Sequence, residues 1–176
     1  MVIAVNDLLV EGSETVQLGL ANSLNYFVGA PGSAALTIFD SPFDQWRVAQ
    51  FGSIAAAQGT NAAPGADWDN DGLGNFVEYS LGLNPTVPDT NGLPKGRLFT
   101  DAGTGQRYLA LDVARNPAAT DVIYAVEVSS YLTNWLSGPP YTVELTNTPA
   151  QLSVRDAQPV SANPQRFLRL KVSPRP

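Results

Sequence analysis

The sequence predicts a mainly β protein in which two regions of antiparallel strands flank a short helical connector. Three observations predict this class: apolar residues alternate with a period of two near both ends of the chain, two helix signals lie between them, and clusters of Gly and Pro separate the runs. At 176 residues and 44% hydrophobic content, the chain can build one ordinary domain or two small ones.

The first 40 residues are expected to form a partial antiparallel sheet. Strand-like runs occupy residues 2–5, 14–20 and 34–39, and Val16, Leu18 and Leu20 fall on one face. Three strands cannot bury both faces of a sheet or pair both of its edges. We therefore expect the open edge of this region, residues 1–40, to be covered by a strand from another copy, from the rest of a longer polypeptide, or from the chain's own tail at residues 167–176.

Residues 41–95 are expected to form a helix–loop–helix connector and linker. Ser41 suits the N-cap of a helix, Pro42 suits its first position, and Gly52 ends it after Phe51. A second helix is indicated by one apolar stripe and by the helix-stopping residues that follow it: Leu73, Phe76, Val77 and Leu81, then Gly82 and Pro85.

Residues 96–176 are expected to form a fibronectin-like antiparallel β-sandwich. Alternating runs occur at residues 108–113, 122–128, 142–145, 151–154 and 167–172. Five or more short strands at this spacing are typical of a sandwich.

The composition excludes several classes of function. The 10 basic and 16 acidic residues give a net charge of −6, which argues against a nucleic-acid partner. Cysteine and histidine are both absent, so thiolate nucleophiles, disulfides, Ser-His-Asp relays and imidazole-ligated zinc are excluded. Any metal must therefore be bound by oxygen. No segment has the roughly 20 apolar residues of a membrane span, and no signal peptide is evident.

The acidic loop from residue 67 to residue 78 carries the most specific chemistry. Counted from its first residue, the ligand positions 1, 3, 5, 7, 9 and 12 of an EF-hand loop fall on Asp67, Asp69, Asp71, Leu73 through its carbonyl, Asn75 and Glu78, with Gly72 at position 6. Ca²⁺ takes six to eight oxygens at about 2.3–2.6 Å, which this spacing can supply. The alternative is a solvated Asp/Asn/Gly turn, but three unpaired aspartates would repel one another without a cation.

The loop lacks the β-branched residue that EF-hands usually place at position 8 to pair with a second loop. Gly74 occupies that position here. We therefore expect a solitary structural calcium site rather than a calcium sensor.

The N-terminal segment resembles the C-terminal part of a Calx-beta domain, a calcium-binding β-sandwich of cell-surface and exchanger proteins. The resemblance rests on the acidic EGSET sequence at residues 11–15 and on ALTIFD at residues 35–40. It implies that Asp7, Glu11 and Asp40 could help to form a second calcium site. Ordinary turn positions are the alternative for all three acids.

The central loop and its continuation, Tyr79-Ser-Leu-Gly-Leu-Asn-Pro85, resemble the solitary calcium loops of dockerin and thrombospondin type-3 repeats. They are still more similar to linker modules of large secreted bacterial proteins of the Planctomycetes type, in which such a loop precedes a terminal β-module. The module here is matched by residues 124–135 and 166–170. This resemblance implies an extracellular, cell-surface location.

These observations favour a non-catalytic, calcium-stabilised structural or adhesive module of a bacterial surface protein. A sharper form of this hypothesis is a filament subunit, with other copies of the chain or the rest of a longer surface protein as partners, assembled by β-strand complementation. No catalytic or organic-cofactor-binding residue is predicted.

Two other classes of function compete with this hypothesis. In an enzyme acting on a glycan, Asp112 and Glu127 could be paired carboxylates, although their strand positions favour solvent-facing acids. In a carbohydrate-binding accessory domain of a secreted enzyme, aromatic side chains could be stacking platforms: Trp46, Trp68, Trp135, Tyr131 and Tyr141.

Overall fold

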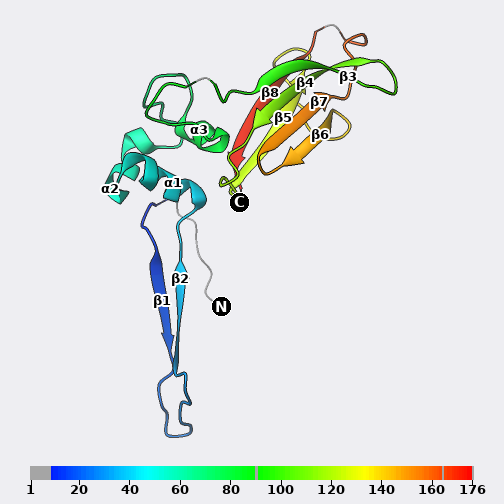
Figure 1. Ribbon diagram of the computed structural model, residues 1–176. Helices are drawn as coiled ribbons and strands as arrows, with labels where there is room; N and C mark the ends of the chain where they lie inside the picture. Colours follow the sequence, from blue (N-terminus) through cyan, green and yellow to red (C-terminus); the bar gives the residue numbers. More distant parts are fainter. Residues whose placement is uncertain (1–8, 90, 164, 176) are drawn as a thin grey trace. The chain divides into compact units, whose positions relative to one another are not determined.

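The computed structural model describes residues 9–89, 91–163 and 165–175, and it confirms the mainly β class with antiparallel sheets. The chain divides into two compact units, one ending at residue 62 and the other beginning at residue 63 (Figure 1). This division runs through the region 41–95 that was expected to be one connector. Its first helix belongs to the N-terminal unit, and its acidic loop and second helix belong to the C-terminal unit.

The N-terminal unit consists of a β-ribbon and short helices. Strands β1 (Glu14–Gly19) and β2 (Ser33–Ile38) pair antiparallel, and helix α1 (Pro42–Phe51) follows with Ser41 as N-cap and Gly52 as C-cap, as the sequence predicts. Residues expected to be a small polar connection instead form α2 (Ile54–Ala57) and a 3₁₀ turn, Thr60–Ala62. The strand expected at residues 2–5 lies outside the described residues.

Packing in this unit is confined to the region of the helices. Its buried apolar residues are Val10, Phe43, Ala57 and Ala62. The guanidinium of Arg47 is buried with them, where it pairs with Asp44 and donates to the Ala57 carbonyl at 3.1 Å. A buried charge with these partners fixes α1 against α2.

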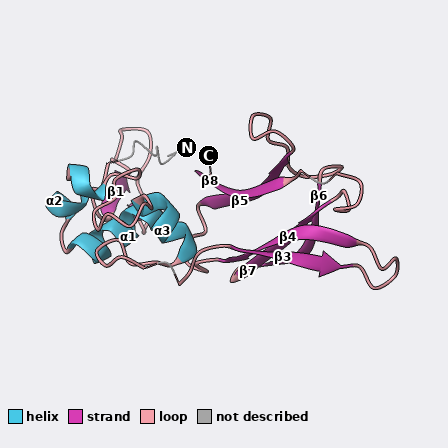
Figure 2. Cartoon of the chain, turned by 90° about the horizontal axis from the view of Figure 1, so that it is seen from above, coloured by secondary structure: helices cyan, strands magenta, loops and turns pink. Residues whose placement is uncertain are grey.

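The C-terminal unit contains two antiparallel sheets. Strands β3 (Lys95–Thr100), β4 (Arg107–Ala114), β7 (Gln151–Asp156) and β6 (Thr142–Thr148) form one sheet in that order, and β5 (Val122–Ser129) pairs with β8 (Phe167–Pro174) in the other. The two sheets lie as separate layers (Figure 2). All five predicted strands are present, and β3 is an additional one that the alternation did not single out.

Alternate residues of the two sheets meet in one core. Its buried members are Leu111 and Val113 from β4, Val126 from β5, Leu152 and Val154 from β7, and Leu81 and Leu83 from the segment that precedes the sheets. The period-two alternation seen in the sequence therefore marks the inward face of each strand.

Helix α3 (Asn75–Leu81) is anchored to this sandwich by its C-terminal half. Gly82 ends the helix with φ at 74°, a left-handed conformation that favours glycine. The last carbonyls of the helix are bound by the sandwich: Asn116 donates to Tyr79 O at 2.9 Å, and the Tyr124 hydroxyl donates to Ser80 O at 2.6 Å. The helix that carries Glu78 is therefore part of the sandwich core.

Within the described ranges, no helix has the length and apolar content that crossing a membrane requires.

Replacing Leu81 with Ala should lower the free energy of unfolding of the C-terminal unit by about 2–5 kcal/mol, because it removes a buried side chain that joins α3 to the sandwich. Denaturant unfolding followed by fluorescence would measure this change. Val87, which is 54% exposed in the same unit, is the matched control. Val87→Ala should change stability by no more than about 0.5 kcal/mol.

Candidate metal centre

Three aspartates of the acidic loop converge on one point. One carboxylate oxygen from each of Asp67, Asp69 and Asp71 lies within 4.8 Å of the other two. Opposite oxygens in a calcium coordination sphere are about 4.6–5.2 Å apart, so these three atoms can share one Ca²⁺.

The backbone of the loop orients these carboxylates. Asp67 accepts from the amides of Asp71 at 3.1 Å and Gly72 at 3.0 Å, and Asp71 accepts from the Leu73 amide at 2.9 Å. Asn70 and Gly72 have φ angles of 61° and 93°, which turn the chain sharply. These turns bring the alternating acids of the loop together in a single cluster.

Glu78 is the buried member of the site. Its side chain is fully buried on α3, and neither carboxylate oxygen has a hydrogen-bond partner. Oδ2 of Asp69 is also buried without a partner. Burial, followed by the charges of Asp69, Asp71 and Asp67, raises the pKa of Glu78 from 4.5 to about 7. A cation among these oxygens would compensate both the lost solvation and the repulsion.

The other two predicted ligands are close in the chain and are fixed by different contacts. Asn75 is fully buried, and its Nδ2 donates to the Ala63 carbonyl at 2.8 Å. Leu73 packs its hydrocarbon side chain against the sandwich core, and its backbone carbonyl is the oxygen that it could offer to a metal. Sequence spacing placed all six residues in one loop, and the structure distinguishes the exposed acid Asp67 from the buried acid Glu78.

Segment 63–66 supports the start of α3, a role that the ligand spacing does not indicate. The amide of Asn75 donates to Ala66 O and that of Phe76 donates to Pro64 O, both at 2.9 Å. A Cβ on Gly74 would lie 3.2 Å from Pro64 O, closer than most real contacts. This close approach explains why glycine stands at loop position 8.

Asp89 was also not predicted from the loop pattern, because it lies 18 residues beyond Asp71. Its backbone amide donates to Asp71 Oδ2 at 3.2 Å. This contact closes the loop from the side of the linker, and only the tertiary structure brings the two segments together.

The second calcium site implied for Asp7, Glu11 and Asp40 stays a prediction. Asp7 lies outside the described residues. Asp40 Oδ2 accepts from the amides of Glu11 and Gly12, at 3.2 and 2.9 Å, so its carboxylate joins two backbone segments of the N-terminal unit.

The two acids considered for glycan hydrolysis lie on different sheets. Asp112 on β4 pairs with Arg97 at 2.6 Å and accepts from Ser153. Glu127 on β5 pairs with Arg169 at 2.7 Å. Each carboxylate thus has an arginine partner of its own, as in structural ion pairs.

The five aromatic candidates for carbohydrate stacking differ in exposure. Trp46 stacks on Phe43 at 5.7 Å, and the guanidinium of Arg169 lies over Trp135 at 4.1 Å. The remaining three are exposed: Trp68, Tyr131 and Tyr141. Carbohydrate binding stays a prediction.

The fold and the site together define a class: a mainly β protein with an acidic, oxygen-only loop suited to a hard cation. Comparison of the chain with protein-family models, curated proteins and solved structures gave no significant match.

Metal-free protein should lose stability in its C-terminal unit as pH rises from about 4.5 to about 7. In this window the folded state binds more protons than the unfolded state, because the pKa of Glu78 is raised by folding. With saturating Ca²⁺ this loss should disappear, because calcium keeps the Glu78 carboxylate ionised in the folded state as it is in the unfolded state over most of this range. Thermal midpoints across this pH range, with and without metal, would measure both slopes. Parallel slopes would contradict a shared site.

Proposed function

We propose that the chain is a non-catalytic, calcium-stabilised structural module of the cell surface, with one Ca²⁺ at the 67–78 loop. The fully buried Glu78 carboxylate, whose two oxygens have no hydrogen-bond partner beside three aspartates, carries this proposal. An ionised carboxyl group is rarely buried without compensation, and here a divalent cation is the group that can supply it.

Calcium is favoured over other metals by the chemistry of the ligands. Carboxylate, amide and carbonyl oxygens suit hard cations, and no Cys or His is available for softer ones. A loop with mixed carboxylate and backbone ligands suits the irregular geometry of calcium better than the octahedral geometry that Mg²⁺ requires.

A structural role is supported by how the site connects to the fold. Glu78 and the core residue Leu81 belong to the same helix, whose last carbonyls are bound by Asn116 and Tyr124 of the sandwich. Calcium at the loop would therefore stabilise the sandwich rather than act on a substrate. An extracellular location fits this proposal, because even a weak site of about 10⁻⁴ to 10⁻³ M would be filled there.

Removing calcium is expected to lower the thermal midpoint of the C-terminal unit. A ligand that binds only the folded state stabilises it by about 2.7 kcal/mol at a hundredfold excess over its Kd. Scanning calorimetry with calcium, with magnesium and with chelator would measure the effect. An unchanged midpoint after chelation, or equal stabilisation by magnesium, would count against a calcium site.

Glu78→Gln should have opposite effects with and without calcium. At pH 8 the metal-free variant should be more stable than the parent protein, because a buried negative charge beside three aspartates is removed. Its calcium affinity should fall sharply, since position 12 supplies two oxygens and a charge. Titration calorimetry and thermal unfolding would measure the two effects.

Two variants serve as controls for this experiment. Asn75→Ala should lower stability under both conditions, because it breaks the contact to Ala63 O, and should weaken calcium less than Glu78→Gln. Glu144→Gln removes an exposed acid from β6 and should leave calcium affinity unchanged. The reverse ranking of the Glu78 and Asn75 variants would show that the loop does not bind as an EF-hand does.

A further inference from the structure

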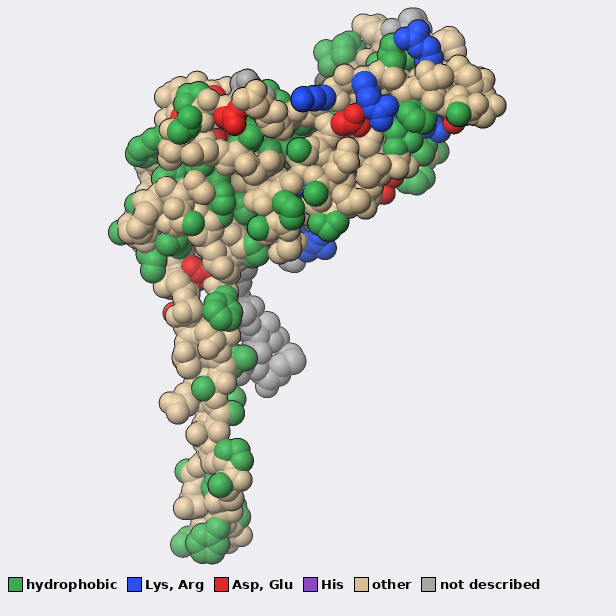
Figure 3. Space-filling model, in the orientation of Figure 1, with side chains coloured by type: hydrophobic (Ala, Val, Ile, Leu, Met, Phe, Trp, Pro, Cys, Tyr) green, Lys and Arg blue, Asp and Glu red, His purple; other side chains and the backbone are tan. Residues whose placement is uncertain are grey.

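The β1–β2 ribbon has one apolar face that the described residues leave uncovered. Directly paired residues share a face, and Val16 pairs with Leu36 while Leu18 pairs with Ala34. Leu18 is 57% exposed and Leu36 is 53% exposed. Hydrophobic side chains also gather at the tip of the ribbon (Figure 3), where Leu24 and Phe27 are almost fully exposed.

Beyond Glu14 at the start of β1, the ribbon lacks the devices that usually protect a free strand edge. Residues 15–39 contain no charged residue, and β1 pairs only with β2 in the described part of the chain. Natural edge strands are usually blunted by Lys, other charges or bulges. An edge without them is suited to pairing with another strand.

The uncovered area is of the size that a specific interface needs. The exposed fractions of Leu18, Leu20, Leu24, Tyr26, Phe27 and Leu36 amount to more than four fully exposed large side chains. At about 200 Å² for each, this is roughly 850 Å². Stable complexes bury about 800 Å² per partner, and the largest apolar patch of a typical monomer is about 300–600 Å².

A matching acceptor edge lies on β5 of the C-terminal unit. Val128 donates to Leu136 O at 2.8 Å and accepts from the Leu136 amide at 3.0 Å, on the side away from β8. Because hydrogen-bonding direction alternates along a strand, Val126 and Tyr124 present their amides and carbonyls on that same side. No described strand continues the Leu136 pairing alongside them.

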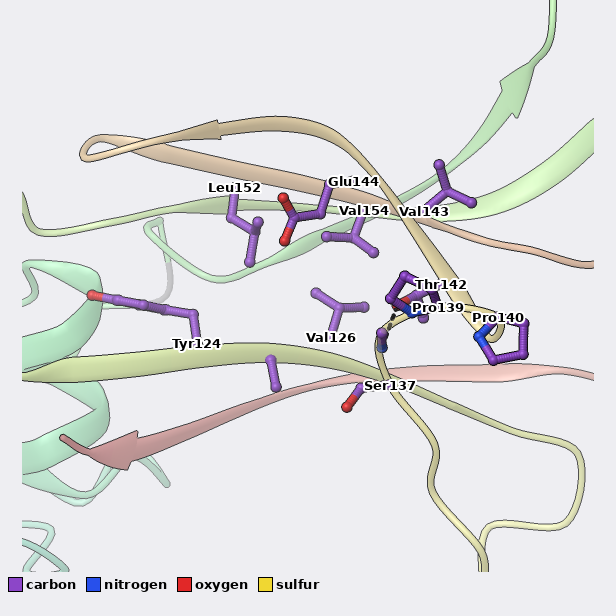
Figure 4. Close-up of a pocket in the computed structure, with 12 residues that line it drawn as sticks. Tyr124, Val126, Ser137, Pro139, Pro140, Thr142, Val143, Glu144, Leu152 and Val154 are labelled. Carbon is purple, nitrogen blue, oxygen red and sulfur yellow. Dashed lines mark hydrogen bonds between the residues drawn. The ribbon is translucent and has the colours of Figure 1, made fainter. Parts of the chain in front are cut away.

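An apolar cleft adjoins this edge. It has a volume of about 590 Å³ and lies between β5 and the strands β6 and β7. Val126 from β5 points toward Leu152 and Val154 from β7 (Figure 4). The only charged side chain among its described lining residues is Glu144.

We propose that strand β1 of one copy pairs with the free edge of β5 in a second copy, directing Val16, Leu18 and Leu20 into the cleft. Backbone hydrogen bonds to Tyr124 and Val126 would extend the pairing that Leu136 begins, and alternate apolar side chains would enter the cleft beside the buried Val126. Donor and acceptor are different surfaces, so repeated contacts generate either a closed ring or an open chain of subunits. This inference extends the structural role proposed above and does not depend on calcium.

A second copy of the chain is the favoured occupant of the cleft, both for the apolar area that its ribbon exposes and for the low charge of the two surfaces. At a net charge of −6, copies repel one another except where their surfaces are uncharged. The donor ribbon between residues 15 and 39 has no charge, and the cleft has one acid. The only acids that this contact could bring near each other are Glu14 at the start of β1 and Glu144 in the cleft.

Cross-linking can test the contact directly, because the chain has no cysteine of its own. Two singly substituted proteins, Leu18→Cys and Glu144→Cys, should form a disulfide-linked pair when mixed at concentrations at which the chain assembles. Glu144 lines the cleft, is exposed, and shares the face of its direct partner Val154. Leu98→Cys is the matched control, since Leu98 is 46% exposed on β3 and outside the cleft, and it should form at least about tenfold less linked product.

Assembly itself should depend on the face of β1 that is changed. Leu18→Glu places a charge on the apolar face and should weaken concentration-dependent association, measured by sedimentation and electron microscopy, by at least about tenfold. Gln17→Glu adds the same charge to the opposite face of the same strand and should retain assembly. Both variants should bind calcium like the parent protein, so loss of assembly is separated from loss of the metal site.

Three outcomes would overturn the proposal. One is a monodisperse monomer at all concentrations. Another is a Leu18→Cys and Glu144→Cys double variant that cross-links only within one chain, which would place β1 on its own sandwich. The third is equal cross-linking of Leu18→Cys to the Leu98→Cys control.

Discussion

The C-terminal unit is built around one buried carboxyl group, whose burial is unfavourable unless its charge is compensated. Glu78 is fully enclosed, its two oxygens have no hydrogen-bond partner, and three aspartates lie nearby. Such a carboxylate either binds a proton, which its raised pKa of about 7 reflects, or requires a cation. The turns at Asn70 and Gly72 gather the aspartates of the loop, whose charges act on Glu78, and Gly74 allows Pro64 O to approach the start of its helix.

The same helix that buries Glu78 also builds the hydrophobic core. Leu81 and, just beyond the helix, Leu83 pack with residues of β4, β5 and β7, and Asn116 and Tyr124 bind the last carbonyls. In the proposed role, metal-binding free energy would therefore contribute to folding, because the ligand geometry exists only when α3 is docked. This coupling also explains how a solitary loop can form without a second EF-hand beside it.

Each of the two units has an apolar surface that no described residue covers. The sandwich opposes four strands with two, so part of the inner space beside β5 is an open cleft. The N-terminal ribbon has an apolar face and no covering layer among the described residues. A two-stranded ribbon is at most marginally stable in water, which favours burial of this face against another surface.

The sequence by itself determined the local features of this protein. Period-two alternation located seven strands, Ser41-Pro42 and Gly52 set the ends of α1, Gly82 ended α3, and the spacing of acids from Asp67 to Glu78 defined the candidate calcium loop. These signals are local because hydrogen-bonding period, capping and ligand spacing act over a few residues.

Only the tertiary structure decided which residues that are far apart in the chain come into contact. It divided the chain at residue 62, joined α3 to the sandwich through Asn116, brought Asp89 to Asp71, and buried Glu78. Burial and long-range pairing depend on which faces meet, which is a property of the whole packed unit.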